Sequence, residues 1–200
     1  MSKELEAARE LVRILEEKER TGMVELATLI PGDVFKVGEH DFIVLEQEDG
    51  QTKVISKGLM AENIVFDEDS RDYNKSNLKS LIETEIQPII EVAVGADNLI
   101  EHEVDLTSVD MQNEYGSCIC KVRPITFDEV REFNNFLVNK NLSDWWWTCT
   151  PWRTAERGWK YSMAVVSPSG YFFDFCFYDV RCGVRPVCIL KSNIFVSKGE

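Results

Sequence analysis

Residues 145–152 read WWWTCTPW, and together with Trp159 they hold all five tryptophans of this 200-residue chain. A second stretch, residues 171–178, reads YFFDFCFY and is aromatic at six of its eight positions. Between the two stretches lie three cations, Arg153, Arg157 and Lys160. Large aromatic rings and arginines anchor protein interfaces more often than other side chains do. The last third of the chain is therefore expected to carry a binding surface.

Some of these side chains are expected to face a partner and others to form the frame of the fold. Successive side chains of a strand point to opposite faces, so only half of residues 171–178 can be exposed. The sequence leaves open which half this is, and whether it packs on the tryptophans instead. We expect Trp146, Val184, Arg185 and Pro186 to belong to the core or frame, with Arg185 a buried cation that binds backbone carbonyls. The candidate partner-binding residues are Trp145, Trp147, Trp152, Arg153, Arg157, Trp159, Lys160, Tyr171, Phe173, Phe175, Tyr178 and Arg181.

Three short extended runs, at residues 33–37, 41–46 and 52–56, are separated by turn signals at Gly38-Glu39 and Glu48-Asp49-Gly50. An Asp-Gly pair between alternating apolar residues is a strong hairpin signal. The runs therefore predict an antiparallel meander. Further extended segments are expected at residues 103–106, 118–122, 161–166, 171–177 and 184–190, with a turn at Pro168-Ser169-Gly170.

Two amphipathic helices are expected in the body of the protein. The first begins near Ser76, breaks or restarts at Pro88, which has no backbone N–H to donate, and ends at Gly95. The second begins at the capping box Thr126-Phe127-Asp128-Glu129. It places Phe127, Val130, Phe133 and Leu137 on one face. Helices combined with a meander and a hairpin-rich tail predict an α+β domain.

Residues 1–22 are expected to form a separate N-terminal amphipathic helix, and residues 23–200 the binding domain. Leu5, Ala8, Val12 and Leu15 recur at the spacing of one helical stripe. Two heptads are too few to stand alone as a coiled coil. Residues 5–15 should therefore pack on the body of the protein or on a second copy, and the sequence does not choose between a packed helix and a homodimer.

The formal net charge of −13 is distributed unevenly along the chain. Residues 1–120 carry 27 acids and 11 bases, whereas residues 121–200 carry 8 acids and 11 bases. Binding to phosphates needs a concentrated positive field, so direct nucleic-acid binding is not expected. The acids either solvate the surface or form a face that imitates nucleic acid or docks on a basic partner.

No secretion signal or membrane-spanning segment is expected, because the N-terminus is charged throughout and the apolar runs are short. We therefore expect a soluble, cytoplasmic protein in which the cysteines are reduced and mostly buried. Their spacing lacks the paired knuckles of zinc sites, so neither metal nor cofactor is expected. The cysteines are Cys118, Cys120, Cys149, Cys176, Cys182 and Cys188.

The sequence does not predict an enzyme. A serine or cysteine nucleophile needs a base within hydrogen-bond reach, and the two histidines, His40 and His102, lie far upstream in extended or loop contexts. Phosphate-binding glycine loops are absent.

The tail carries three motifs in order: WWWTCTPW at residues 145–152, AVVSPSG at residues 164–170 and GVRPV at residues 183–187. This arrangement resembles a family of uncharacterised domains common in phages and gut bacteria. The segment DYNKSNL at residues 72–78 is similar to the one that opens the first helix in that family. The resemblance covers roughly residues 30–195. It implies a C-type-lectin-like fold, shared with formylglycine-generating enzyme and with phage receptor-binding proteins. A shared fold indicates a scaffold and not a function.

The chain departs from these relatives at their functional residues. It lacks the Glu-Pro-Asn, Gln-Pro-Asp and Trp-Asn-Asp triplets of calcium-dependent lectins. Cys176, Cys182 and Cys188 do not align with the copper-binding pair of formylglycine-generating enzyme. The first interpretation is accordingly a non-catalytic module, related to phage or prophage proteins, that recognises a protein partner. The alternatives are an anti-CRISPR-like inhibitor, whose acidic half blocks the DNA channel of a nuclease, and a copper-dependent oxidase of the formylglycine-generating type.

Overall fold

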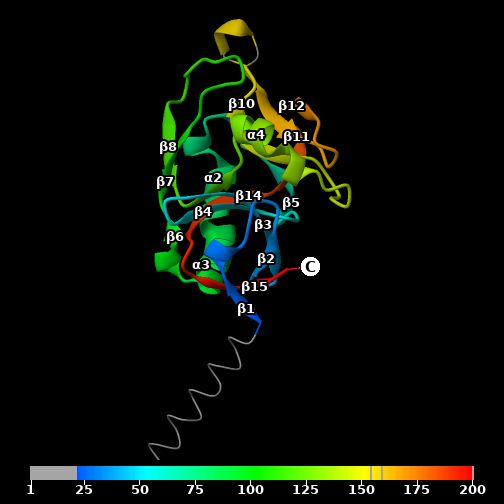
Figure 1. Cartoon of the computed structure of the whole chain (residues 1–200). Helices are drawn as coiled ribbons and strands as arrows, with labels where there is room; N and C mark the ends of the chain where they lie inside the picture. The colour runs from blue at the N-terminus through cyan, green and yellow to red at the C-terminus, as the bar shows by residue number, and fades with distance from the viewer. Residues whose placement is uncertain (1–21, 154, 159, 200) are drawn as a thin grey trace, which may run out of the picture.

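The computed structural model describes residues 22–153, 155–158 and 160–199 (Figure 1). It has an α+β fold built from two curled sheets, a two-stranded ribbon and helices that cover the sheets. The predicted helix at residues 1–22 lies outside the described residues except for Gly22, and Trp159 also lies outside them. The α+β prediction is confirmed for the described part of the chain.

The first sheet contains the predicted meander. Its strands follow the order β1-β15-β2-β3-β4-β14-β6, and β9 also pairs with β14. The turns between the meander strands begin after Val37, which pairs with His40, and after Glu48, which pairs with Gln51. The bounds are β1 Met23–Glu25, β2 Val34–Val37, β3 His40–Glu48, β4 Gln51–Ser56, β6 Leu99–Ile100, β9 Val122–Pro124, β14 Pro186–Lys191 and β15 Phe195–Lys198.

The second sheet contains most of the aromatic tail. Its order is β12-β11-β10-β13-β5, antiparallel except for the pair β10–β13. A separate ribbon pairs β7 with β8. The bounds are β5 Ala61–Val65, β7 His102–Asp105, β8 Ser117–Cys120, β10 Trp146–Pro151, β11 Ser162–Val166, β12 Phe172–Cys176 and β13 Arg181–Val184.

One sequence prediction about the strands is wrong. Residues 184–190 do not form a single strand, because the chain passes from one sheet to the other at Arg185. Val184 ends β13 in the second sheet, and its carbonyl accepts a hydrogen bond from the Met60 N–H at 2.9 Å. Pro186 begins β14 in the first sheet, where it pairs with Pro124. The change of sheet depends on these distant partners, which an apolar run cannot reveal.

The first predicted helix begins and ends at the expected residues. The Ser76 side chain caps it by accepting from the Lys79 N–H, and Gly95 ends it with a φ of 86°. Pro88 is the second residue of α3 and follows a π-helical turn of the same helix, so its missing N–H falls where the hydrogen-bond pattern changes. A π-helical turn before it lets the helix continue. The segments are α2 Asn77–Leu81, the π-turn Ile82–Ile86 and α3 Gln87–Val94.

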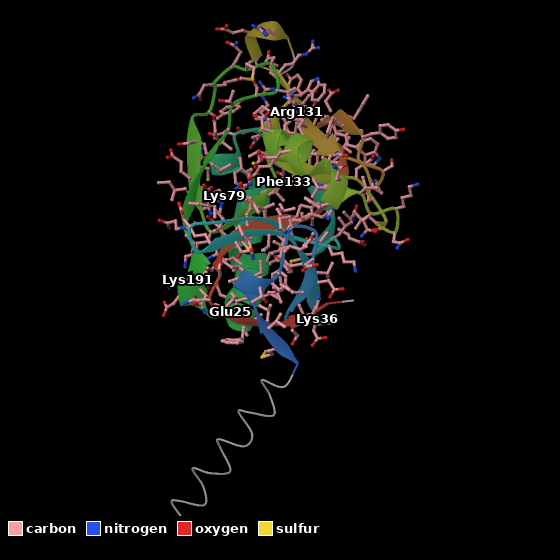
Figure 2. All side chains as sticks on the ribbon, viewed as in Figure 1. Glu25, Lys36, Lys79, Arg131, Phe133 and Lys191 are labelled. Atoms are coloured by element: carbon pink, nitrogen blue, oxygen red, sulfur yellow. The ribbon has the colours of Figure 1, made fainter. Side chains whose placement is uncertain are left out.

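The second predicted helix is α4, Phe127–Leu137, and both bonds of its capping box are present. Its inward residues are those expected from the sequence: Val130, Phe133 and Leu137 are buried, and Phe127 is half-buried. Figure 2 labels Phe133, which lies on the side of α4 that faces the body, and Arg131, which lies on the outer side. Short 3-10 turns occupy Leu26–Thr28, Tyr73–Lys75, Ala96–Asn98 and Ala155–Arg157.

The apolar side chains form two clusters on opposite faces of the second sheet. The larger cluster joins the α2–α3 helix to the first sheet and includes Trp147 and Val165. The smaller cluster joins α4 to the opposite face of the second sheet and includes Trp146 and Val166. Because neighbouring residues of a strand point in opposite directions, adjacent tryptophans reach different cores.

Candidate functional site

Trp146 belongs to the frame of the protein, as expected from the sequence. It is fully buried in the cluster beneath α4. The guanidinium carbon of Arg185 lies 4.6 Å from the centre of its ring. A cation over a tryptophan face is attracted by the negative charge of the π-system, and the attraction is strongest where water is excluded.

Arg185 is the buried, hydrogen-bonded cation that the sequence predicts. Its Nε donates to the Ser56 carbonyl at 3.0 Å, and its Nη1 donates to the Leu137 carbonyl at 2.8 Å. Burial lowers the pKa of Arg185 to about 10, so the side chain stays charged at neutral pH. Leu137 is the last residue of α4, where the helix dipole favours a positive charge. Arg185 therefore ties α4 to β4 at the point where the chain changes sheets.

The prediction that Trp147 binds a partner is wrong. Its side chain is fully buried, and its indole Nε1 donates to the Ile64 carbonyl at 2.8 Å. Phe66 meets the ring edge-on, with ring centroids 5.7 Å apart. Trp147 therefore has its polar atom satisfied and its ring packed, and it joins β10 to the segment around β5.

Three other rings form a cluster at the surface, called here the aromatic face: Trp145, Phe173 and Phe175. The ring centroids of Trp145 lie 6.4 Å from Phe173 and 5.2 Å from Phe175, and those of Phe173 and Phe175 are 6.0 Å apart. Trp145 and Phe175 are half-buried, whereas 55% of Phe173 is exposed. The pairing Trp147↔Val165↔Phe173 places the aromatic face on the same side of the sheet as the larger core. The rings are thus the exposed margin of that core.

The direction of the side chains in β12, left open by the sequence, is set by α4. Phe172 packs beneath α4, with its ring 5.1 Å from that of Phe127. Alternation then puts Phe173 and Phe175 on the opposite side of the sheet. Phe177 continues the alternation on the side of Phe173 and Phe175, where it is buried in the larger core and only 3% exposed. Tyr171, just before β12, is 71% exposed.

Tyr178 and Lys160 belong to a second ring cluster and not to the aromatic face. The Tyr178 ring centroid lies 5.6 Å from Tyr161 and 5.1 Å from Phe177. The Lys160 Nζ lies 4.8 Å from the centre of the Tyr161 ring. Arg181, at the start of β13, donates from Nη1 to the Asn63 carbonyl at 3.1 Å. The residues predicted to form a single binding surface therefore lie in separate places.

The cationic loop after β10 has contacts of its own. Trp152 is half-buried and meets Phe127 edge-on at 6.3 Å between ring centroids. Arg157 forms an ion pair with Asp110 at 3.2 Å, and Arg153 is exposed. The 3-10 turn at Ala155–Arg157 forms the upper tip of the molecule in Figure 1. No described contact joins Trp152 or Arg157 to the aromatic face, so the structure does not bring these predicted residues together with it.

Sequence reasoning missed a buried polar network beside the start of α4. Both terminal nitrogens of Arg123 donate to the Glu129 carboxylate at 2.7 Å, and its Nε donates to His102 Nε2 at 3.0 Å. Lys53 lies 3.4 Å from the same carboxylate. These residues line a hollow of about 290 Å³. The capping box points to Glu129, but nothing in the sequence indicates that Arg123 is its partner.

The network fixes the protonation of its members. Burial opposes ionisation of Glu129, but the charge and hydrogen bonds of Arg123 outweigh it and lower the pKa to about 2. Burial, together with the charge of Arg123, lowers the pKa of His102 to about 4. The neutral ring has both nitrogens occupied, since Nδ1 lies 3.3 Å from the Ile100 carbonyl and Nε2 accepts from Arg123. His102 therefore holds Arg123 in place.

The cysteines are free thiols, and all but Cys176 are buried, as predicted. Burial raises the pKa of Cys149, Cys182 and Cys188 to about 12, so these thiols stay protonated at neutral pH. Cys118 and Cys120 share a hydrogen bond that lowers the pKa of Cys118 and raises that of Cys120. Among the described residues, no group of three or more His, Cys, Asp and Glu side chains is placed to hold a metal ion.

The chain matches no family model, no curated protein and no solved structure. Within the described ranges, none of the helices combines the length and the apolar character that crossing a membrane requires.

Proposed function

We propose that this chain is a non-catalytic module that binds a protein partner through the aromatic face. The observation that carries the proposal is the contiguous cluster of Trp145, Phe173 and Phe175 at the margin of the second sheet. Apolar side chains scattered singly over a surface are ordinary, whereas clustered exposed rings mark interaction sites. Tyr171, 71% exposed just before β12, extends the same stretch of chain.

The packing of the rings also suits them to binding a partner. Trp145 and Phe175 are held against the larger core, so little side-chain freedom is lost when a partner covers them. Rings of this size bury much apolar area while freezing few torsions. A partner that covers the aromatic face would therefore gain most of its affinity from these few residues.

A matched pair of variants tests the proposal. Phe173→Ser removes the most exposed ring of the aromatic face, and Ile119→Ser removes a comparably exposed apolar residue, 64% against 55%, from β8. Affinity capture from a candidate host with each form, followed by mass spectrometry, should recover a partner with wild type and Ile119→Ser but not with Phe173→Ser. The measured affinity for that partner should fall by about 2 kcal/mol or more, on the order of 30-fold. Equal capture by all three proteins would refute the proposal.

The proposal includes the finer fold and the setting of the protein. We take the domain to be C-type-lectin-like, encoded by a phage, prophage or gut bacterium, and cytoplasmic. The support is the chain order, in which a meander and a helix precede α4 and a hairpin-rich tail returns to the first sheet at GVRP. Superposition of an experimental structure on C-type-lectin-like domains tests the fold, and the neighbouring genes test the origin. Neighbours encoding tail fibres would support the setting, and an operon of host metabolism would count against it.

A second candidate function rests on a band of acidic surface. Glu46, Glu48 and Asp49 line one hollow, which shares Lys53 and Ile189 with the hollow beside α4. The hollow beside α4 also shares Glu103 and Asp105 with a third hollow. Such a band suits an anti-CRISPR-like inhibitor that docks in the basic DNA channel of a nuclease.

The inhibitor candidate makes a separate prediction. Purified protein should reduce DNA binding by a CRISPR nuclease, and the double variant Glu103→Lys, Asp105→Lys should lose that inhibition, while Phe173→Ser should retain it. Absence of inhibition by the wild-type protein would remove this candidate and leave the aromatic face untouched.

A further inference from the structure

The outer edge of β12 presents backbone groups that the sheet does not use. The Ser167 N–H donates to the Tyr171 carbonyl at 2.9 Å, and the Phe177 N–H donates to the Tyr161 carbonyl at 3.0 Å, so the odd-numbered residues bond to β11. Backbone groups of the even-numbered residues therefore point away from β11. The Cys176 carbonyl accepts from the Val180 N–H at 3.3 Å. The N–H and C=O of Phe172 and Asp174 have no backbone partner among the residues the structure describes, and β12 ends the sheet.

The two sides of this edge differ in chemistry. Phe173 and Phe175 project on one side as part of the aromatic face. Asp174 projects on the other side, half-buried in the middle of the strand. Within residues 22–153, 155–158 and 160–199, no cation lies within ion-pair distance of its carboxylate. β12 contains no lysine or arginine, the residues by which natural edge strands usually avoid pairing.

We propose that β12 accepts an extended segment of a basic partner as an added antiparallel strand. The inference rests on the proposed function and specifies how the partner binds. The added strand would bond to the outward N–H and C=O of Phe172 and Asp174, in the manner of other strand-addition complexes. Because side chains alternate along a strand, its residues beside Phe173 and Phe175 are apolar, and the residue opposite Asp174 is lysine or arginine. The partner segment therefore alternates apolar and basic residues.

The charge of the chain favours such a partner over a second copy. A second β12 strand, FFDFC, supplies no cation to Asp174 in any register. Two copies also each carry a formal net charge of −13, which opposes their encounter. A basic segment is attracted by the same charge and can place a cation directly across from the carboxylate, within the reach of cross-strand pairs.

The experiment uses a capped peptide of about nine residues that alternates valine and lysine, a length typical of strands. Calorimetry measures its binding to the full chain, and amide hydrogen exchange locates it. The peptide should slow amide exchange at Phe172 and Asp174. Two further peptides, called the twins, carry a methyl group on the backbone nitrogen either of every lysine or of every valine, and the two should differ in affinity. Only one methylated series blocks the edge that faces β12, so one twin should lose binding at least tenfold while the other retains it. Equal effects of the two twins would overturn strand addition.

Reversing the charge at Asp174 tests whether this carboxylate recognises the basic residue of the partner segment. Asp174→Lys should weaken binding of the valine–lysine peptide at least tenfold and bind a valine–glutamate peptide that wild type rejects. Far-ultraviolet dichroism checks that Asp174→Lys is folded, and the rescue by the second peptide gives a gain of signal that an unfolded protein cannot produce.

Three results would count against the proposal: no binding at millimolar peptide, unchanged exchange at Phe172 and Asp174, or a dimer by light scattering in which these amides are already protected. The first two would leave the proposed function standing if a captured partner still required Phe173. If the captured partner bound Phe173→Ser as well as it binds wild type, the proposed function itself would be wrong. The two failures are thus distinguishable.

Discussion

Trp146 and Trp147 are fully buried on opposite faces of one strand, whereas Trp145, one residue earlier, is half-buried beside two exposed or partly exposed phenylalanines. Trp146 supports α4 and carries the guanidinium of Arg185, and Trp147 bonds to the Ile64 carbonyl. Trp145 has rings from β12 as neighbours and lies where the larger core reaches the surface. A run of tryptophans is therefore not in itself a site, because the strand direction and the covering elements assign each ring a separate role.

The largest expected effect comes from the buried pair. Trp146→Ala and Trp147→Ala should each lower the free energy of unfolding by roughly 3–5 kcal/mol, since each leaves a cavity in a packed core. Trp145→Ala should cost no more than about half as much, because its ring is partly solvated already. Urea unfolding followed by circular dichroism measures all three. Equal losses of unfolding free energy in Trp145→Ala and Trp147→Ala would show that Trp145 is part of the packed core to the same extent as Trp147.

Acid should lower the free energy of unfolding. The pKa of Glu129 falls from its ordinary 4.5 to about 2 on folding, so its contribution of about 3 kcal/mol is present above pH 4.5 and is lost as the pH falls toward 2. The pKa of His102 falls to about 4, which removes further stability between pH 6.5 and 4. Unfolding should therefore become easier steadily below pH 6.5.

Glu129→Gln isolates the carboxylate in this pH dependence. The variant should be less stable at pH 7 by about 3 kcal/mol, because Arg123 keeps a buried charge without its counter-ion. Its stability should then fall less steeply between pH 4.5 and 2 than that of wild type. Parallel pH profiles for the two proteins would show that Glu129 does not supply the acid sensitivity.

A smaller effect is expected at Arg185. Arg185→Lys keeps the charge but cannot reach the Ser56 and Leu137 carbonyls together while presenting a guanidinium to Trp146. The free energy of unfolding should fall by about 2 kcal/mol, because one buried carbonyl is left without its donor. Thermal unfolding measures it, and Arg131→Lys on the exposed side of α4 is the control. An unchanged melting temperature in Arg185→Lys would mean that the frame does not depend on this cation.

The smallest effect on stability belongs to the aromatic face. Phe173→Ser should change the free energy of unfolding by less than about 0.5 kcal/mol, as substitutions at exposed positions generally do. The same variant is the one expected to lose partner affinity. A destabilisation as large as that of Trp147→Ala would show that Phe173 is part of the packed frame.

Local signals in the sequence predict much of the fold. The Asp-Gly turn, the Ser76 and Thr126 caps and Gly95 each act through neighbours a few residues away, and the structure has all of them as expected. The core position of Trp146 and the bonding of Arg185 to carbonyls are also confirmed.

What the sequence could not supply depends on distant partners. Trp147 is buried because Ile64 and Phe66 lie against it, some eighty positions earlier in the chain. The direction of β12 is set by Phe127 of α4. Arg123 is only six residues from Glu129, but it lies on β9, which is held in place by pairing with the distant strand β14. Periodicity describes one segment at a time, so it predicted a single surface where packing buries Trp147 and divides the other residues among separate parts of the surface.

The position of β14 and β15 in the first sheet has a consequence for how the protein is made. β14 pairs with β4, β6 and β9, and β15 lies between β1 and β2. In Figure 1 β15 (red) lies beside β1 (blue), the earliest described strand, and β14 crosses the middle of the body. During synthesis β2 and β4, the outer strands of the meander, lack their partners β15 and β14 until residues 186–198 have left the ribosome. Contacts so far apart in sequence slow folding and leave strands unpaired in the meantime. The nascent chain is therefore most vulnerable to misassembly before residues 186–198 have been made.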